Sequence, residues 1–435
     1  MHSRGFDSRV FILMVVIGLV FLSFALFLVA SLEDIESRTK NAVSSVDNEL
    51  ATDADVVWPY PFVHVLNTRF MQQQPHLESL GQARLLLFEI ICLQTVVRQS
   101  VIEMHQEQDV PPFLWIIKVD PALSMNLRQR MVTLVEPYPF IYLVASNVNY
   151  GIGIHPGGWR GGEAGTDVLQ SEVLTGNMTL LRLAHKSRRQ RIVLETRLDA
   201  DDGLNLEYLK SIQEEANRKL RSEGTKPPSN DWIYWCTLNH LDWTPTPPYI
   251  DSSDDNAGLF MPVRSAQSCT TAGITLGVSV GVEEESIPRF MHQKLYEELR
   301  IKKIHPRCGR RTNATKCLKM VSSPLVGAIR CRSTTSAGMR GIGLESKGDD
   351  NALTDPEFLS RALSTEFGIA LDGISTVTQY YRRNFESIVL ENLQGQCTHG
   401  HSCKLSTKES LQELLDVVSN HSIGGTLVDP KWTGS

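Results

Sequence analysis

A run of 21 residues without a charged side chain, from Val10 to Ala30, decides how the rest of the chain can be organised. A helix that spans a bilayer needs roughly 20 apolar residues, whereas the apolar core of a cleavable signal peptide has about 7 to 15. We therefore expect residues 10–30 to form an uncleaved transmembrane helix, with cleavage after Ser31 as the alternative. The chain then divides into a tail (residues 1–9), this anchor and a body beyond it.

Two features predict that the body lies in the lumen of the secretory pathway. Glycosylation sequons begin at Asn177, Asn313 and Asn420, and such sites have a meaning only there. All eight cysteines follow the anchor, and an even number of them fits disulfides in an oxidising compartment. We expect a single-pass type II membrane protein that is held in the lipid bilayer by residues 10–30.

Composition argues against one large class of function. The formal charge is 43 basic minus 49 acidic residues, or −6. A nucleic-acid-binding protein carries a basic footprint instead. We therefore expect no nucleic-acid partner.

Apolar runs that alternate with helical patterns predict the fold of the body. After a polar stem (residues 31–56), we expect strands at 62–66, 113–120, 139–145 and 191–198, and helices at 77–99 and 204–220. Strands that are buried on both faces and separated by helices indicate a mainly parallel sheet of the α/β class. In such sheets ligands bind beyond the carboxyl ends of the strands.

Three carboxylates, Asp199, Asp201 and Asp202, follow the last of these strands. Charges this close repel one another, so the cluster is costly unless a cation neutralises it. A hard divalent ion such as Mn²⁺ or Mg²⁺ binds carboxylate and phosphate oxygens, and it stabilises a departing diphosphate. The alternative is an acidic turn that caps the next helix.

The run ETRLDADDGL (residues 195–204) resembles the TRLDxDD signature of the rhamnosyltransferase family and the LDADD strand end of many GT-A glycosyltransferases. Residues 64–70, 84–92 and 113–120 resemble the opening strand, first helix and second strand of that family. The resemblance implies a GT-A fold with a Rossmann-type sheet, a nucleotide-sugar donor and a divalent metal. It implies a catalytic domain over residues 57–304, which residues 305–435 extend with helical, cysteine-containing material.

The resemblance also assigns roles to individual residues. It implies that Asp199 and Asp201 hold the metal and that Asp201 and Asp202 serve catalysis, with Asp202 facing the donor sugar. Arg197 would pair with donor phosphate or, equally well, with a neighbouring carboxylate. The nucleotide site would be lined by Asn67, Thr68, Arg69 and Asp120. The acceptor base stays open; candidates are Asp251, Asp254, Asp255 and Glu283 to Glu285, while His292 and His305 are further candidate metal ligands.

Other patterns compete with this interpretation. Gly277 to Gly281 (GVSVG) matches the nucleophile elbow of an α/β-hydrolase with Ser279 as nucleophile, or else a glycine-rich strand. The loop 151–165 holds seven glycines and predicts a mobile lid rather than a phosphate cradle. The spacing of Cys397 and Cys403 favours a disulfide over a zinc site. Clustered tryptophans could stack on a sugar or pack in the core; they are Trp232, Trp235 and Trp243.

Together these observations predict a Golgi membrane enzyme. Its expected activity is the transfer of a sugar, with rhamnose as one possibility, from a nucleotide-sugar donor to a glycan or glycoprotein acceptor. The alternatives are a hydrolase that uses Ser279, and a membrane-tethered carbohydrate-binding protein without catalysis.

Overall fold

The computed structural model describes residues 57–72, 74–146, 171–222, 228–245, 258–265, 269–270, 272–282, 287, 295–302, 308, 316–333, 356–384, 387–388 and 391. The expected anchor and stem therefore lie outside the described residues. So do the glycine-rich loop 151–165, the candidate acids and histidines at 251–255, 283–285, 292 and 305, the sequons at Asn313 and Asn420, and Cys397 and Cys403.

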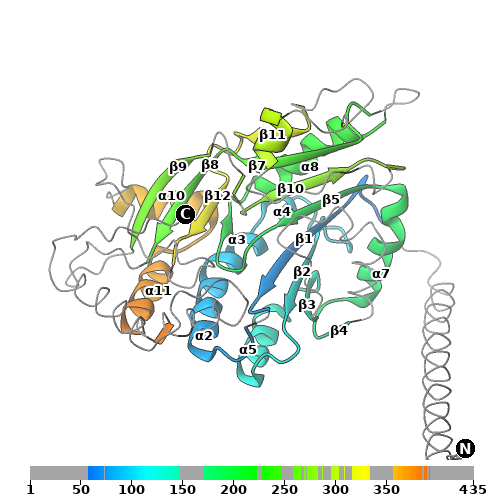
Figure 1. Ribbon diagram of the computed structural model, residues 1–435. Helices are drawn as coiled ribbons and strands as arrows, with labels where there is room; N and C mark the ends of the chain where they lie inside the picture. The colour runs from blue at the N-terminus through cyan, green and yellow to red at the C-terminus, as the bar shows by residue number, and fades with distance from the viewer. Residues whose placement is uncertain are drawn as a thin grey trace, which may run out of the picture. The chain divides into compact units, whose positions relative to one another are not determined.

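An eight-stranded sheet forms the centre of the fold (Figure 1). Its order is β11-β7-β10-β5-β1-β2-β3-β4. The strands are β1 (Phe62–Phe70), β2 (Leu114–Val119), β3 (Ile141–Ala145), β4 (Glu172–Val173), β5 (Ile192–Arg197), β7 (Trp232–Thr237), β10 (Ile274–Val278) and β11 (Leu318–Val321). The four expected strands form the parallel block β5-β1-β2-β3, which confirms the α/β class.

The flanks of this sheet are mixed rather than parallel. β10 runs antiparallel to both β5 and β7, and β4 runs antiparallel to β3, whereas β11 is parallel to β7. A second, four-stranded sheet has the order β6-β12-β8-β9. Its strands are β6 (Gly203–Leu204), β12 (Ala328–Cys331), β8 (Asn239–Thr244) and β9 (Leu259–Arg264).

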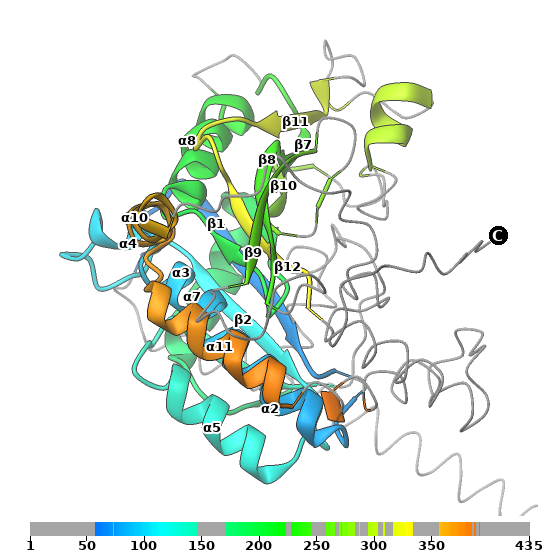
Figure 2. The ribbon, with the colours of Figure 1, turned by 90° about the vertical axis from the view of Figure 1, so that its left-hand side faces the viewer.

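Helices pack along the strands, and Figure 2 shows α2, α5, α8 and α11 on one side of them. The helical segments are α2 (Glu78–Leu87), η1 (Phe88–Leu93), α3 (Gln94–Val97), α4 (Ser100–Glu103), α5 (Met125–Val135), α7 (Met178–Ser187), η2 (Arg188–Gln190), α8 (Tyr208–Leu220), η4 (Glu297–Lys302), α10 (Pro356–Phe367) and α11 (Leu371–Arg383). The side chain of Asn177, which opens the first sequon, accepts hydrogen bonds from Thr179 and Leu180 and so caps α7.

The segments α2, η1 and α3 form one continuous helix, Glu78–Val97, as the apolar stripe predicts. By length and composition this helix could cross a membrane. Its apolar window is 61% buried inside the protein, however, and Phe88 packs on Trp115 of β2 with ring centroids 5.6 Å apart. The helix is therefore part of the hydrophobic core of the body.

Two expected boundaries differ from the structure. The helix expected from residue 204 begins at Tyr208, because Gly203 and Leu204 pair with β12 as a short strand. β1 continues to Phe70, so Asn67, Thr68 and Arg69 lie within the strand rather than beyond it. The alternation of a strand then places neighbours among them on opposite faces.

Tryptophans and disulfides build the second half of the body. Trp232, Trp235 and Trp243 are each 1% exposed or less, so they pack in the core and cannot stack on a sugar from solution.

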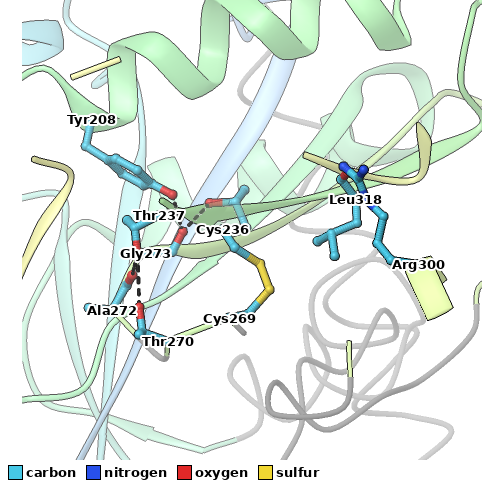
Figure 3. Close-up of a disulfide and its surroundings, with 10 residues drawn as sticks. Tyr208, Cys236, Thr237, Cys269, Thr270, Ala272, Gly273, Arg300 and Leu318 are labelled. Atoms are coloured by element: carbon cyan, nitrogen blue, oxygen red, sulfur yellow. Dashed lines mark hydrogen bonds between the residues drawn. A yellow bond between two sulfur atoms is a disulfide. The ribbon is translucent and has the colours of Figure 1, made fainter. Parts of the chain in front are cut away.

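Cys236 pairs with Cys269, and Cys308 pairs with Cys317. Figure 3 shows the first of these disulfides beside Thr237 and Thr270. These bonds agree with the expected oxidising compartment.

Candidate functional site

The acidic turn follows β5, the outer strand of the parallel block, which pairs with β1 on one side and with antiparallel β10 on the other. Leu198 is buried, and its backbone N–H donates to the carbonyl of Asn67 (3.0 Å). The backbone N–H of Asp202 then donates to the carbonyl of Asp199 (3.1 Å), which closes the turn. Asp199 and Asp201 are partly exposed, whereas Asp202 is 3% exposed. The structure thus separates two accessible carboxylates from a buried one.

Asp199 forms an ion pair with the last residue of β5. Its Oδ1 lies 3.1 Å from Nη2 and 3.3 Å from Nε of Arg197. The side chains are 33% and 16% exposed, respectively. This contact is the carboxylate pairing that the sequence left open beside phosphate binding, and it holds Asp199 at the edge of the sheet.

The protonation of Asp201 is set by its surroundings. Desolvation and then the charge of Asp199 raise the pKa of this carboxyl to about 6, although Arg84 and Arg330 oppose both effects. Carboxylates raise one another's pKa when they share a small space, because both cannot ionise freely. A cation near Asp199 and Asp201 would relieve this repulsion.

Asp202 links the two sheets. Its Oδ1 accepts a hydrogen bond of 2.9 Å from the backbone N–H of Cys331 in β12. Desolvation, followed by the charges of Asp201 and Asp199, raises its pKa well above the ordinary value. These facts describe a buried structural acceptor, and the expected role of Asp202 toward a donor sugar stays a prediction.

Three cationic side chains lie together on one face of the parallel strands. Arg69 of β1 is the register partner of Lys118 in β2, and Asn67, two residues earlier, is the partner of Arg197 in β5. Residues two apart on a strand share a face, as do register partners. Burial and the charge of Arg197 lower the pKa of Arg69, while Asp199 counteracts them. This strand-end row of Arg69, Lys118 and Arg197 favours an anionic ligand.

Other expected nucleotide-site residues make contacts within the scaffold, and their role toward a nucleotide stays a prediction. Thr68 faces the opposite side of β1, where its Oγ1 accepts a hydrogen bond from the indole N–H of Trp115 (2.9 Å). Asp120 follows β2, and its Oδ1 accepts from the backbone N–H of Ala122 (2.9 Å). Asn67 and Arg69 are the expected residues that share a face with Arg197.

Two arginines near the acidic turn were missed by sequence reasoning. Arg84 lies on α2, where its Nη1 donates to Oε1 of Gln74 (2.7 Å), and Arg330 lies on β12. Both charges act on Asp201. No spacing along the chain connects them with the acidic turn, so only the folded arrangement reveals them.

The carboxylate pair can be tested as a metal site by its donor set. Asp199 and Asp201 offer oxygen atoms of the kind that Mn²⁺ and Mg²⁺ prefer. Among the described residues no group of three or more His, Cys, Asp or Glu side chains is arranged to hold a metal ion. The fit is therefore to an ion that takes two protein carboxylates and completes its coordination with substrate phosphates and water, as Mg²⁺ commonly does.

The hydrolase alternative does not fit the geometry. Ser279 is 1% exposed, and its Oγ lies 2.8 Å from the carbonyl of Asn230 and 3.0 Å from that of Leu220. It follows the antiparallel strand β10 and precedes a turn, whereas a nucleophile elbow exposes its serine between a strand and a helix. The GVSVG pattern is therefore part of a strand end.

A surface hollow of about 500 Å³ lies on α10. It is lined by Glu357, Ser360, Arg361, Ser364 and Thr365, and none of these belongs to the acidic turn or to the strand-end row.

The chain matches no protein-family model and no curated protein. The chemistry of the strand ends is therefore the basis for a functional conclusion.

Proposed function

We propose that this chain is a metal-dependent glycosyltransferase with a GT-A-type catalytic domain, which moves a sugar from a nucleotide-sugar donor to a glycan or glycoprotein. One observation carries the proposal: the carboxylates of Asp199 and Asp201 lie at the carboxyl end of β5, beside the strand-end row of Arg69, Lys118 and Arg197. A hard cation and a diphosphate are the ligands that such a combination attracts.

Within this proposal Asp199 and Asp201 hold Mn²⁺ or Mg²⁺, which supplies neutralisation of the charge that develops on the departing diphosphate. The strand-end row attracts the phosphate oxygens. Lys118 is 6% exposed, and the side chain of Arg197 is 16% exposed, so both charges act where little water screens them. The ion pair of Arg197 with Asp199 keeps that carboxylate oriented until a metal and a donor arrive.

The resemblance of residues 195–204 to the rhamnosyltransferase signature supports this choice of chemistry, with the donor sugar left open. Residues 10–30 form the membrane anchor in this proposal, and the catalytic body lies in the Golgi lumen. Two disulfides in the described part of the body support a lumenal location. A carbohydrate-binding protein without catalysis is the competing class.

The test is donor binding by the full-length protein in detergent. UDP-, GDP- and dTDP-sugars are titrated with and without Mn²⁺, and release of the nucleoside diphosphate is followed in parallel. We expect one donor class to bind only with metal. Asp199→Asn and Asp201→Asn should each weaken metal-dependent binding by about tenfold or more, because each removes a charged oxygen ligand.

The matched control is Glu207→Gln, which removes an exposed carboxylate that pairs with Lys210 outside the site. It should bind the donor like the unmodified protein. Equal loss in all three variants, or metal-independent binding, would contradict the proposal. Donor binding without any turnover would favour the non-catalytic class.

A further inference from the structure

A second polar cluster lies on the small sheet, one strand away from the acidic turn. β8 and β12 are parallel, with His240 opposite Ala328 and Asp242 opposite Arg330. Alternation places His240 and Asp242 on one face with Arg330 and Arg332. The intervening side chains, Leu241, Trp243, Ile329 and Cys331, belong to the main hydrophobic core. We call the four polar side chains the small-sheet cluster.

The small-sheet cluster is held by contacts around one carboxylate. Oδ1 of Asp242 lies 3.1 Å from Nε2 of His240, and Nε of Arg332 donates to its Oδ2 (3.1 Å). Burial opposes ionisation of Asp242, but His240, Arg332 and Arg330 together hold its pKa below the ordinary value. Asp242 is therefore a carboxylate that faces the Nε2 side of an imidazole.

The other ring nitrogen of that imidazole is buried. His240 is 2% exposed, and in the part of the chain that the structure describes neither its two ring nitrogens nor Oδ1 of Asp242 makes a hydrogen bond. A buried polar atom without a partner costs roughly 1–3 kcal/mol. Nε2 lies at ion-pair distance from Oδ1 of Asp242 (3.1 Å), so Nδ1 is the nitrogen left to accept a proton.

The small-sheet cluster adjoins the proposed metal site. β12 pairs with β6, which begins directly after Asp202, and Cys331 donates from its backbone N–H to that carboxylate (2.9 Å). The charge of Arg330 acts on Asp201 and Asp202 as well as on Asp242. One arginine therefore lies between the acidic turn and the His240–Asp242 pair.

We infer that the small-sheet cluster is the acceptor side of the active site, with His240 as the base that activates a hydroxyl group of the acceptor. This inference rests on the proposed function. The hydroxyl oxygen bonds to the anomeric carbon of the donor, and the bond from that carbon to the diphosphate oxygen breaks with its electron pair. The hydroxyl proton moves to Nδ1 of His240, and Asp242 stabilises the resulting imidazolium. Arg330 and Arg332 orient oxygen atoms of the acceptor.

The experiment uses water as the acceptor, so that no glycan has to be identified first. The full-length protein in detergent receives Mn²⁺ and the donor found by the binding screen. Donor affinity and the rate of donor hydrolysis are measured for His240→Asn and Asp242→Asn. Arg264→Gln is the control, because Arg264 is an exposed cation on the neighbouring strand β9. Thermal unfolding reports whether each variant is folded.

We expect hydrolysis to fall about 100-fold or more in both variants, as general-base catalysis predicts, with donor affinity changed by less than about twofold. Asp242→Asn decides the question if His240→Asn does not fold. Unchanged hydrolysis, or an equal loss of donor affinity and hydrolysis, would overturn the inference, as would a protein that binds the donor but never hydrolyses it. Failure of the unmodified protein to bind any donor would instead refute the proposed function on which the inference depends.

Discussion

The backbone N–H of Cys331 donates a hydrogen bond of 2.9 Å to Oδ1 of Asp202, and this contact joins the small sheet to the turn that follows β5. The carboxyl group is 3% exposed, and its raised pKa favours the uncharged form. Asp202 therefore differs in kind from its neighbours Asp199 and Asp201, which keep part of their surface exposed.

Two replacements of Asp202 should distinguish the contribution of its hydrogen bond to stability from the contribution of its charge. Asp202→Asn keeps an acceptor oxygen for the Cys331 N–H, so we expect its free energy of unfolding to stay within about 0.5 kcal/mol of the unmodified protein. Asp202→Ala leaves that N–H buried without a partner and should lose roughly 1–3 kcal/mol. Urea unfolding measures both values. If Asn destabilises as much as Ala, the ionised carboxylate is required and the assignment is wrong.

Asp201 should make the body less stable as the pH rises through its titration range. Its pKa is raised from 3.8 to about 6 by desolvation and then by Asp199. Between these values the unfolded chain releases a proton that the folded protein retains, so stability falls by at most about 1.4 kcal/mol per pH unit. Above pH 6 this loss of stability has reached its full value. Asp201→Asn removes it and should be the more stable protein at pH 7 without metal.

The measurement is thermal unfolding of both proteins at pH 3.5 and at pH 7, each with and without Mn²⁺. The two proteins should differ least at pH 3.5, where Asp201 is protonated in the folded protein and mostly protonated in the unfolded chain. Mn²⁺ should raise the unfolding temperature of the unmodified protein at pH 7 and have a smaller effect on Asp201→Asn. A variant that is less stable at pH 7 without metal would show that the charge is already compensated.

Much of the central sheet was predictable because its strands are continuous apolar runs. The four expected strands are present as β1, β2, β3 and β5, and the acidic turn lies at their carboxyl edge because parallel strands end on the same side. The mixed flank was not predictable, since the pairing of β10 with β5 and β7 joins residues far apart in the chain. Gly203 and Leu204 form a two-residue strand that has no periodicity to detect.

The candidate site also combines residues that the local sequence predicts with residues that only the folded arrangement reveals. Asp199, Asp201 and Arg197 were found because they lie within five residues of the sequence, whereas Arg84, Arg330 and the His240–Asp242 pair come from other elements. β1 extends to Phe70 and places the side chain of Thr68 against Trp115, while its expected place in the nucleotide site stays a prediction. Local patterns identify strand ends, but the direction of each side chain depends on where the strand stops.

His64 should make the body sensitive to acid. Its Nδ1 accepts a hydrogen bond from Gln213 (3.1 Å), and its Nε2–H donates to Oγ1 of Thr196 (2.8 Å), so the neutral ring is satisfied on both sides. Burial lowers its pKa from 6.5 to about 3. Between these values the unfolded chain binds a proton that the folded protein excludes. The stabilising contribution of neutral His64 is therefore fully present above pH 6.5, and the free energy of unfolding falls by up to about 1.4 kcal/mol per pH unit below it.

His64→Gln should flatten this dependence while lowering stability at pH 7.5, because the glutamine cannot reproduce both contacts of the ring. Urea unfolding at pH 7.5, 6.5, 5.5 and 4.5 gives the two profiles. Gln213→Glu is a useful companion, since a carboxylate beside Nδ1 would stabilise the protonated ring, raise the folded-state pKa of His64 toward its ordinary value and so reduce the loss of stability below pH 6.5. Parallel profiles for His64→Gln and the unmodified protein would show that another group controls the response to acid.

The two disulfides should contribute unequally, both to stability and to the site. Cys236 and Cys269 are 33 residues apart, whereas Cys308 and Cys317 are 9 apart. A larger closed loop loses more entropy in the unfolded chain, so Cys236→Ala/Cys269→Ala should cost about 1 kcal/mol more than Cys308→Ala/Cys317→Ala, within a typical range of about 2–4 kcal/mol for each.

The larger loop also supports the end of β5. Cys269 leads into Thr270, whose hydroxyl lies 3.0 Å from that of Thr237 (Figure 3). The chain then reaches Gly273, whose backbone N–H donates to the carbonyl of Arg197 (3.0 Å). We therefore expect loss of Cys236–Cys269 to weaken donor binding severalfold, while loss of Cys308–Cys317 leaves it nearly unchanged. Donor titration of both folded variants tests this. Equal effects on donor binding would mean that the backbone beside Arg197 is held without the disulfide.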